Sequence, residues 1–288
     1  MNRPAEIAPD ATALPRRPIL PGFGLTLGYS TAYLGFVVLL PLAALVLRSA
    51  QLSPHEWLAL LAAPRTLAAL RLTVCASVAA AVANGVFGTL VAWVLTRYRF
   101  PGKGLLDALV DLPFALPTAV AGIALTTLYA PGGWLGRLLA PLGVQVAFTP
   151  LGVIVALSFI SLPFVVRTIQ PVLADLDADL ERAAETLGAH PVTVFWRVVL
   201  PVLLPALLTG CGLAFSRALG EYGSVIFIAG NIPLVSEVMS LLIMGRIEQF
   251  QHREAAALAV LMLVISFAFM FLLNAAQLAL HRRQQGRR

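Results

Sequence analysis

Long stretches without a charged side chain dominate the pattern of apolar and polar positions along the chain. A bilayer core about 30 Å thick needs roughly 20 apolar residues as a helix, whereas barrel strands alternate in polarity over about ten residues. The stretches are continuously apolar, so the pattern predicts an all-α membrane protein with six transmembrane helices. They comprise residues 18–47, 72–96, 112–136, 138–166, 198–216 and 255–281.

The composition agrees with a chain that lies in a membrane. Of its 288 residues, 59% are hydrophobic and only 12% are charged, and the mean hydropathy is +0.87. A soluble domain is about a quarter charged, because its surface must face water. The low charge content therefore excludes an ordinary soluble globule.

The apolar stretches divide the chain into four regions. We expect an N-terminal tail over residues 1–21, and the first transmembrane helix with an external link over 22–64. A core of five transmembrane helices should follow over 65–281, with a long polar loop at 171–197, and a basic tail should end the chain over 282–288.

Lys and Arg are distributed unequally between the two sides of the predicted bundle. With six crossings, both tails and the links at 97–111 and 167–197 share one side, which holds thirteen of the 20 Lys and Arg residues. The side richer in these residues faces the cytoplasm in membrane proteins. We therefore expect both termini to be cytoplasmic.

The sequence lacks the motifs of several chemical functions. It contains no Gly-x-x-x-x-Gly-Lys-Ser/Thr phosphate loop, no His/Cys/acid cluster with metal-ligand spacing and no Gly-x-Ser-x-Gly. Cys75 and Cys211 are too few and too far apart for a disulfide framework or a metal site. From these missing motifs we expect no metal, no cofactor and no catalytic residue. The pI near 10 comes from membrane-flanking arginines, so we also expect no nucleic-acid partner.

Two shorter segments carry local signals. Ser53-Pro54 followed by Glu56 predicts a helix start in the external link. Residues 220–231 are apolar but too short and too glycine-broken to cross a bilayer, which favours a re-entrant or interfacial piece. Pro117 falls inside the expected third helix, where a proline removes a backbone donor and kinks the helix.

The long loop after the fourth helix predicts a short amphipathic helix. Three aspartates stand at its start, where the helix dipole favours negative charge, and Gly188 followed by Pro191 ends it. The five acids over 175–185 would be repelled by an anionic leaflet, so we expect the helix to dock on a protein partner rather than on the bilayer. Its apolar positions are Leu176, Leu180, Ala183, Ala184 and Leu187.

The same loop carries a family motif. The order Ala183-Ala184, three residues, Gly188, nine residues, Val198, one residue, Leu200-Pro201 resembles the cytoplasmic loop of ABC-importer permeases, written Glu-Ala-Ala, three residues, Gly, nine residues, Ile, one residue, Leu-Pro. The spacing agrees throughout, although an arginine stands where the family has its Glu. The resemblance implies that ATPase coupling involves Leu180, Glu181, Arg182, Ala183, Ala184, Leu187 and Gly188.

Further segments extend the resemblance over nearly the whole chain. Residues 97–102, 107–122, 163–171 and 220–231 resemble the T subunits of sulfate/thiosulfate ABC permeases, and the last segment is also similar to molybdate permeases. The resemblance implies a type I ABC importer permease fold in the bacterial inner membrane, with residues 65–281 as the permease core. It also implies a W-type second permease subunit, an ATP-binding subunit dimer and a periplasmic sulfate-binding protein as partners, with ATP bound by the ATPase subunit.

One charged pair falls near the outer end of the fifth helix. Arg217 and Glu221 lie four residues apart, so they share a helix face and can pair. Ionisable residues at membrane depth usually face a bundle interior or a water-filled path. The pair either lines the outer gate of an anion path, with Arg217 attracting the oxyanion, or locks the following loop. Gly220 and Gly223 leave backbone amides accessible to an anion.

The residues and the resemblance together favour a permease subunit of an ATP-driven sulfate or thiosulfate importer. Molybdate or another tetrahedral oxyanion is the alternative substrate. A secondary anion transporter would need coupling-ion carboxylates inside the membrane, and apart from Glu221 the apolar stretches lack them. A membrane enzyme would need a catalytic constellation, which the sequence does not contain.

Overall fold

The computed structural model describes residues 22–285, and every regular element in that part of the chain is a helix. This confirms the all-α prediction. The tail at 1–21 and the last three residues of the basic tail lie outside the described residues. The chain forms two units, residues 1–47 and 48–288, each with its own internal contacts.

The first unit contains one candidate span. Helix α1 (Phe23–Leu34), a π-helical turn (Gly35–Leu39) and α2 (Leu40–Ser49) follow without a break. Together they form a predominantly apolar stretch of 27 residues that is long enough to cross a bilayer. Leu40 and Pro41 follow the π-helical turn. Because a proline has no amide proton and crowds the carbonyl four residues earlier, the preceding turn widens.

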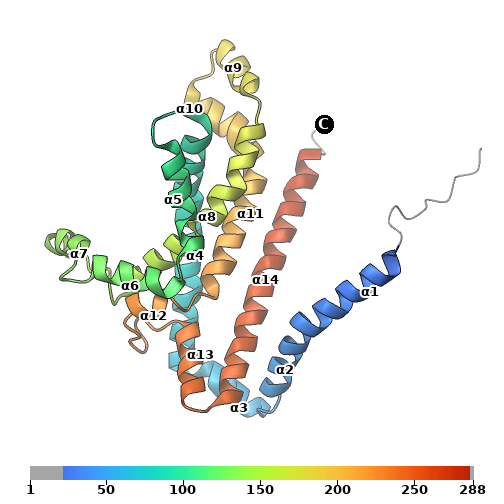
Figure 1. Ribbon diagram of the computed structural model, residues 1–288, viewed down its shortest axis with the longest axis vertical. Helices are drawn as coiled ribbons and strands as arrows, with labels where there is room; N and C mark the ends of the chain where they lie inside the picture. Colours follow the sequence, from blue (N-terminus) through green and yellow to red (C-terminus); the bar gives the residue numbers. More distant parts are fainter. Residues whose placement is uncertain (1–21, 286–288) are drawn as a thin grey trace, which may run out of the picture. The chain divides into compact units, whose positions relative to one another are not determined.

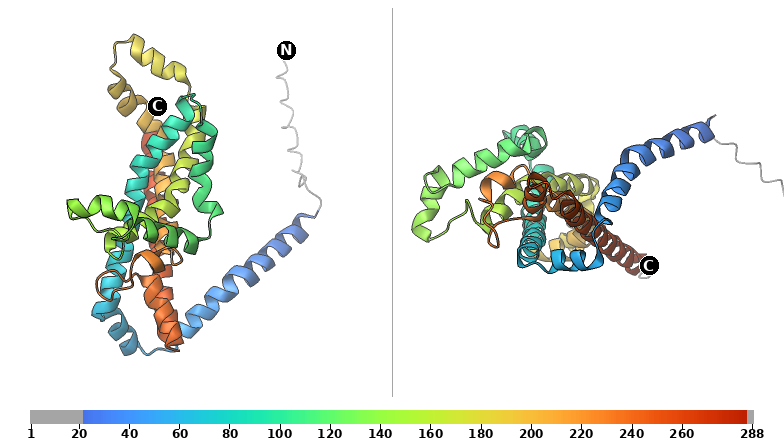
Figure 2. Two further views of the ribbon diagram at one scale, coloured as in Figure 1. Left: turned by 60° about the vertical axis from the view of Figure 1, so that its left-hand side comes forward. Right: turned by 90° about the horizontal axis from the view of Figure 1, so that it is seen from below.

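Three long helices form the centre of the second unit. Helices α4 (Pro64–Arg97), α8 (Pro150–Asp175) and α11 (Leu200–Leu219) pack side by side (Figure 1, Figure 2). A short helix, α10 (Pro191–Val194), and a π-helical turn (Phe195–Val199) lead directly into α11. This turn again stands just before a leucine and a proline, as in the first unit.

Small residues and one polar contact bring these helices together. A Cβ on Gly88 of α4 would lie 3.0 Å from the Val165 side chain, and a Cβ on Gly210 of α11 would lie 3.0 Å from the Val165 backbone. Close approach at small residues is the usual packing mode in membranes. Asn84 adds a buried hydrogen bond to the hydroxyl of Ser161 at 2.9 Å.

The third predicted span is not one straight helix. Helices α5 (Lys103–Ala115) and α6 (Thr118–Tyr129) belong to a pair that is bent by 113°. The bend falls at Leu116 and Pro117, because the residue before a proline avoids the helical conformation; Leu116 is extended, with φ −85° and ψ 135°. The prediction of a single helix over 112–136 is therefore wrong. Six candidate spans remain if the bent pair counts as one, and five if it does not.

The fourth and fifth spans are shifted from their predicted bounds. The charge-free residues 138–149 hold part of a short helix, α7 (Trp134–Leu139), a 3₁₀ turn (Ala140–Leu142) and a loop, so α8 begins only at residue 150. The fourth span then continues through Arg167.

The fifth span runs from residue 191 to 219, past Arg197 and Arg217. The polar link between the fourth and fifth spans is therefore shorter than the predicted loop at 171–197. It covers residues 176–190 and holds helix α9 (Ala178–Thr186).

Three further helices meet at the end of the second unit opposite α9, and the last of them then runs back along the unit (Figure 1). Helix α3 (Pro54–Ala62) begins at the predicted position with a capping box, in which the amide of Glu56 donates to the hydroxyl of Ser53 and the amide of Ser53 donates to the carboxylate of Glu56. Helices α13 (Met239–Glu248) and α14 (His252–Gln285) meet in a tight turn at the same end.

Helix α12 (Val225–Ile228) lies in the segment expected to be re-entrant or interfacial. It packs against α6 and α8, and both its first and last residues are buried. A Cβ on Gly122 of α6 would lie only 2.5 Å from the carbonyl oxygen of Ser224, so α6 must present a glycine at this contact. The segment is thus part of the protein interior.

Candidate coupling and translocation sites

Helix α9 is short, acidic and closed at both ends by local hydrogen bonds. The carboxylate of Asp177 accepts a hydrogen bond from the amide of Asp179 at 2.9 Å and caps the start of the helix. At the other end, the amides of Gly188 and Ala189 donate to the carbonyls of Glu185 and Ala184 at 2.9 and 3.1 Å. These two bonds form a Schellman motif.

Gly188 ends α9 for a conformational reason. Its φ of 84° is left-handed, and nothing lies within 4 Å of the position that a Cβ would occupy. An L-residue with a side chain costs roughly 1 kcal/mol in this conformation. The glycine therefore sets the direction in which the chain leaves the helix, and space alone would not prevent substitution.

The apolar face of α9 is uncovered in this chain. Leu180 is 52% exposed and Leu187 is 89% exposed, and Ala183 lies exposed between them, whereas Ala184 is half-buried. Leu176 does not belong to this face, contrary to prediction. It precedes α9 and is buried in the core that α8 shares with α4 and α11.

An arginine of α4 holds α9 against the bundle. Arg97 forms an ion pair with Glu181 and its guanidinium also lies 3.5 Å from the carbonyl oxygen of Leu176. The same guanidinium carbon lies 5.7 Å from the centre of the Trp93 ring. Because Arg97 and Glu181 are both about four-fifths buried, this contact ties the last turn of a spanning helix to the short polar helix.

Arg182, in the motif position where a glutamate was expected, points away from this contact. Its guanidinium pairs with Asp179 at 2.9 Å, three residues earlier on α9, and both side chains are about three-quarters exposed. Exposed pairs of this kind contribute little to stability. Arg182 is consequently available to a partner, while the neighbouring Glu181 is occupied within the chain.

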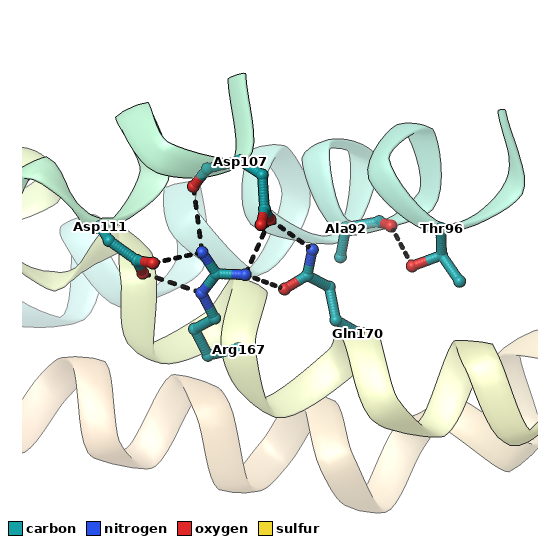
Figure 3. Close-up of polar contacts among 6 residues, drawn as sticks. All are labelled: Ala92, Thr96, Asp107, Asp111, Arg167 and Gln170. Atoms are coloured by element: carbon teal, nitrogen blue, oxygen red, sulfur yellow. Dashed lines mark hydrogen bonds and ion pairs between the residues drawn. The ribbon is translucent and has the colours of Figure 1, made fainter. Parts of the chain in front are cut away.

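A second charged cluster joins α5 to α8 (Figure 3). The guanidinium of Arg167 donates to both oxygens of Asp111, at 2.8 and 2.5 Å, and to Asp107 and Gln170, at 2.8 and 2.7 Å. The amide of Gln170 also donates to Asp107 at 3.2 Å. Because its charge is neutralised, Arg167 does not end the helix at the membrane, and one half of the bent pair is fixed to α8.

Arg217 and Glu221 pair as the helical spacing indicated. Their closest nitrogen and oxygen atoms lie 2.6 Å apart, with the Glu221 side chain 2% exposed and the Arg217 side chain 34% exposed. The other carboxylate oxygen accepts hydrogen bonds from the amide and the hydroxyl of Ser224, at 2.9 and 3.1 Å. Glu221 thus links the end of α11 to the turn that leads into α12.

The two predicted glycines near this pair differ in their surroundings. Gly223 touches the start of α6, since a Cβ there would collide with the Thr118 hydroxyl. Gly220 has open space around it. The hydroxyl of Ser240 donates to the carbonyl of Glu221 at 2.7 Å, which fixes the backbone between the two glycines to α13.

The coupling and translocation residues form two separate groups. The first group lies on α9 and at its end, before α11 begins, and the second lies at the far end of α11 and in the following turn. The helical residues 191–216 separate the two groups, which is about 40 Å along the helix axis. Any communication between them passes along the spanning helices.

Known proteins that resemble this chain belong to the family that the motif indicated. Residues 84–286 match the model of a family described as binding-protein-dependent transport system inner membrane component. The chain belongs to this family. The sulfate transport system permease protein CysT of Salmonella typhimurium is 48% identical over 274 residues, which cover 95% of this chain and 99% of that protein. The protein of the same name in Escherichia coli is 49% identical over the same shares.

Solved structures of ABC importers share the fold. A bacterial transporter that imports the acidic polysaccharide alginate aligns with a TM-score of 0.72 at 15% identity, over 88% of this chain and 94% of that chain. The inward-facing MetNI methionine transporter aligns with a TM-score of 0.51 at 18% identity, over 74% and 96%. This chain therefore has the ABC importer permease fold and is a multi-pass membrane protein.

A cavity of about 360 Å³ opens in this permease beside Ser216 and Gly220, the chain neighbours of Arg217 and Glu221, although neither member of that pair lines it. It lies between α11, α13 and α14, and Gly220 forms part of its wall. Ser216, Ser240 and Ser266 contribute hydroxyl groups to an otherwise largely apolar lining. The hydroxyl of Ser216 is buried without a hydrogen-bond partner among the described residues.

Sequence reasoning missed the contacts that join distant parts of the permease. Arg65 binds the carboxylate of Glu237 with two hydrogen bonds of 2.7 Å, across 172 residues of sequence. Arg97 and Arg167 were counted only as charges that flank the membrane. Each is a cation within or at the edge of the membrane, and such a cation usually has a carboxylate partner. The periodicity of the sequence does not identify which carboxylate that is.

The described part of the chain contains no group of three or more His, Cys, Asp or Glu side chains that could hold a metal ion.

Proposed function

We propose that this chain is the T-type permease subunit of an ABC importer that carries sulfate and thiosulfate into the cytoplasm. The observation that carries the proposal is the identity of 48–49% with sulfate permeases over nearly the full length of both chains. Substrate specificity depends on many side chains along a path, and the match covers 95% of this chain and 99% of the relative. A W-type subunit would form the other half of the pathway.

ATP hydrolysis belongs to a partner subunit in this proposal. The sequence has no phosphate-binding loop, so the permease needs an ATPase dimer that moves its spanning helices. Helix α9 has the features of a contact with that ATPase. Its apolar residues Leu180, Ala183 and Leu187 are exposed, whereas its acidic residue Glu181 is fixed to α4 through Arg97.

The orientation follows from the same assignment. If α9 meets a cytoplasmic ATPase, the links on its side of the bilayer are cytoplasmic, and that side carries most of the Lys and Arg. Both termini then lie in the cytoplasm of a bacterial cell, with the protein in the inner membrane. The opposite end, with α3 and the α13–α14 turn, faces the periplasm, where a substrate-binding protein delivers the anion.

Arg217 is the residue of the outer group that we assign to the anion path. The carboxylate of Glu221 is occupied by Arg217 and Ser224, so its role is to hold the arginine and the turn. Arg217 keeps a third of its side chain exposed, and the open space at Gly220 adjoins the cavity. A partly neutralised arginine can attract a sulfate ion and still release it.

Uptake of labelled anions in a strain without its own sulfate and molybdate permeases tests the proposal. The chain is expressed with its ATPase, its W-type partner and its binding protein. We expect uptake of sulfate that thiosulfate inhibits and that excess molybdate leaves largely unchanged. Uptake of molybdate in preference to sulfate would replace the proposed substrate, and uptake that persists without the ATPase would contradict ATP-driven import.

A further inference from the structure

A bulky residue occupies an unfavourable backbone position at the tip of the α13–α14 turn. Phe250 has a φ of 60°, and the amides of Phe250 and Gln251 donate to the carbonyls of Ile247 and Arg246, both at 2.9 Å. These bonds form a Schellman motif with Phe250 at the position that usually holds glycine. Gly188 holds the equivalent position after α9, in the ordinary way.

The phenyl ring of Phe250 gains almost nothing from the rest of the chain. Its residue is 84% exposed, and the only aromatic neighbour in the described part of the chain is His252, with ring centres 6.2 Å apart. Both the left-handed backbone and the exposed ring cost free energy. Phe250 has an unfavourable backbone conformation and an exposed apolar ring, and no contact within the chain compensates for either cost. Such a residue indicates contact with another molecule.

Charged side chains lie beside this phenylalanine. Phe250 lines a cleft of about 340 Å³ between the start of α3 and the α13–α14 turn, together with Arg48, Arg253, Glu56 and Glu254. Glu254 is neutralised by the guanidinium of Arg246, whereas Glu56 accepts a hydrogen bond from the amide of Ser53 and keeps its charge, on which Arg253 acts electrostatically. Neither Arg48 nor Arg253 forms an ion pair with another described residue. With Glu254 neutralised, the two arginines outnumber Glu56, so the cleft carries a net positive charge.

The surroundings of Phe250 favour a protein over the bilayer as the group that covers the ring. Residues 248–254 consist of charged, amide and imidazole side chains apart from Phe250, and the apolar stretch of α14 begins only at residue 255. An aromatic residue of a membrane interface is usually Trp or Tyr, whose polar atoms reach water. This end of the unit also lies opposite α9, as Figure 1 shows.

We infer that Phe250, with Arg48 and Arg253, forms a docking point for the periplasmic binding protein, whose matching surface would be acidic and would hold an apolar pocket for the ring. The inference rests on the proposed function and its orientation. A buried aromatic ring surrounded by polar contacts is the usual composition of an interface hot spot. The arginines would supply charge complementarity and faster encounter.

Two substitutions separate the role of the ring from that of the backbone. Phe250→Gly and Phe250→Asn both suit a left-handed position, so neither should lower the thermal stability of the purified complex. Both should raise the binding-protein concentration that half-stimulates the ATPase by about tenfold or more. Phe250→Leu, which keeps an apolar side chain, should retain most of the stimulation. Leu58→Ala, at an exposed helical position of α3 on the same end, serves as the control and should leave this concentration unchanged.

The measurement uses the full complex in nanodiscs, with the substrate-loaded binding protein titrated at two salt concentrations. Arg253→Gln should raise the half-stimulating concentration mainly at low salt. The inference is overturned if Phe250→Gly leaves that concentration unchanged, or if Leu58→Ala raises it equally. A Phe250→Gly effect that appears only as a change in thermal stability with nanodisc lipid would assign the ring to the bilayer instead. Absence of any stimulation with the unaltered chain would contradict the proposed function itself.

Discussion

Replacing Arg167 with methionine tests whether the cluster between α5 and α8 holds the bent pair in place. The change shortens the side chain only slightly and removes every hydrogen bond that the guanidinium donates to Asp107, Asp111 and Gln170. The two aspartates remain four residues apart on one face of α5, where like charges repel each other. We expect α5 to loosen from α8 and the folded subunit to lose stability.

The magnitude follows from the exposure of the three charged side chains. Exposed ion pairs contribute about 0–1 kcal/mol, and breaking a buried pair costs about 3–5 kcal/mol. Arg167, Asp107 and Asp111 are 33%, 44% and 48% exposed, so the cluster lies between these limits. A loss of roughly 2 kcal/mol would lower the melting temperature by about 4–8 °C.

The assay is thermal unfolding of the purified subunit complex, read together with subunit abundance in membranes. A triple variant, Arg167→Met with Asp107→Asn and Asp111→Asn, should regain most of the lost stability because no uncompensated charge is left. Arg182→Gln is the matched control. It breaks an arginine–aspartate pair whose side chains are 73% and 75% exposed, and it should cost less than about 1 kcal/mol.

Two results would refute this reasoning. If Arg167→Met and Arg182→Gln lowered the melting temperature equally, burial would not decide the energy of these pairs. If the effects of the three substitutions in the cluster were strictly additive, the residues would not act on one another as the structure has them.

Three further perturbations address the end of α9, the Arg217–Glu221 pair and the capping box of α3. Gly188→Trp should leave membrane insertion unchanged and abolish uptake, because a left-handed position then carries a side chain; wild-type uptake at normal subunit levels would contradict this. Glu221→Gln should lower subunit abundance more than the double variant with Arg217→Gln, since the single change leaves an unpaired cation in the membrane; a double-mutant cycle on abundance measures the coupling. Hydrogen bonds from the amide and hydroxyl of Ser53 lower the pKa of Glu56 below its usual 4.5, so the capping box stabilises α3 above that pH and loses this contribution as the pH falls through the lowered pKa. Fluorescence of Trp57, whose indole donates to the carbonyl of Ser49 at 3.1 Å, should report this change, and Glu56→Ala should remove it.

Local patterns in the sequence predicted local structure well. The capping box of α3, the end of α9 at Gly188 and the pair of Arg217 with Glu221 each depend on residues three or four positions apart. Such contacts are decided by helix geometry, which the sequence displays directly. The number of apolar stretches also predicted up to six spans, which is the number found if the bent pair counts as one.

Charges were a poor guide to where the spanning helices end. Arg167 lies inside α8 because Asp107 and Asp111 of α5 neutralise it, and these partners become its neighbours only after packing. Arg217 lies inside α11 because Glu221, four residues further on, neutralises it. Conversely, residues 143–149 carry no charge but form a loop. The bend at Pro117 could be expected from the proline, although its angle of 113° depends on the contact of α6 with α12.

Uptake by purified components tests the central account most directly. The chain is reconstituted in liposomes with its W-type partner and its ATPase, with ATP sealed inside and labelled sulfate and binding protein added outside. The account predicts sulfate accumulation that requires both the ATP and the binding protein and that stops with Gly188→Trp. Accumulation of sulfate without ATP, driven by an ion gradient alone, would contradict it.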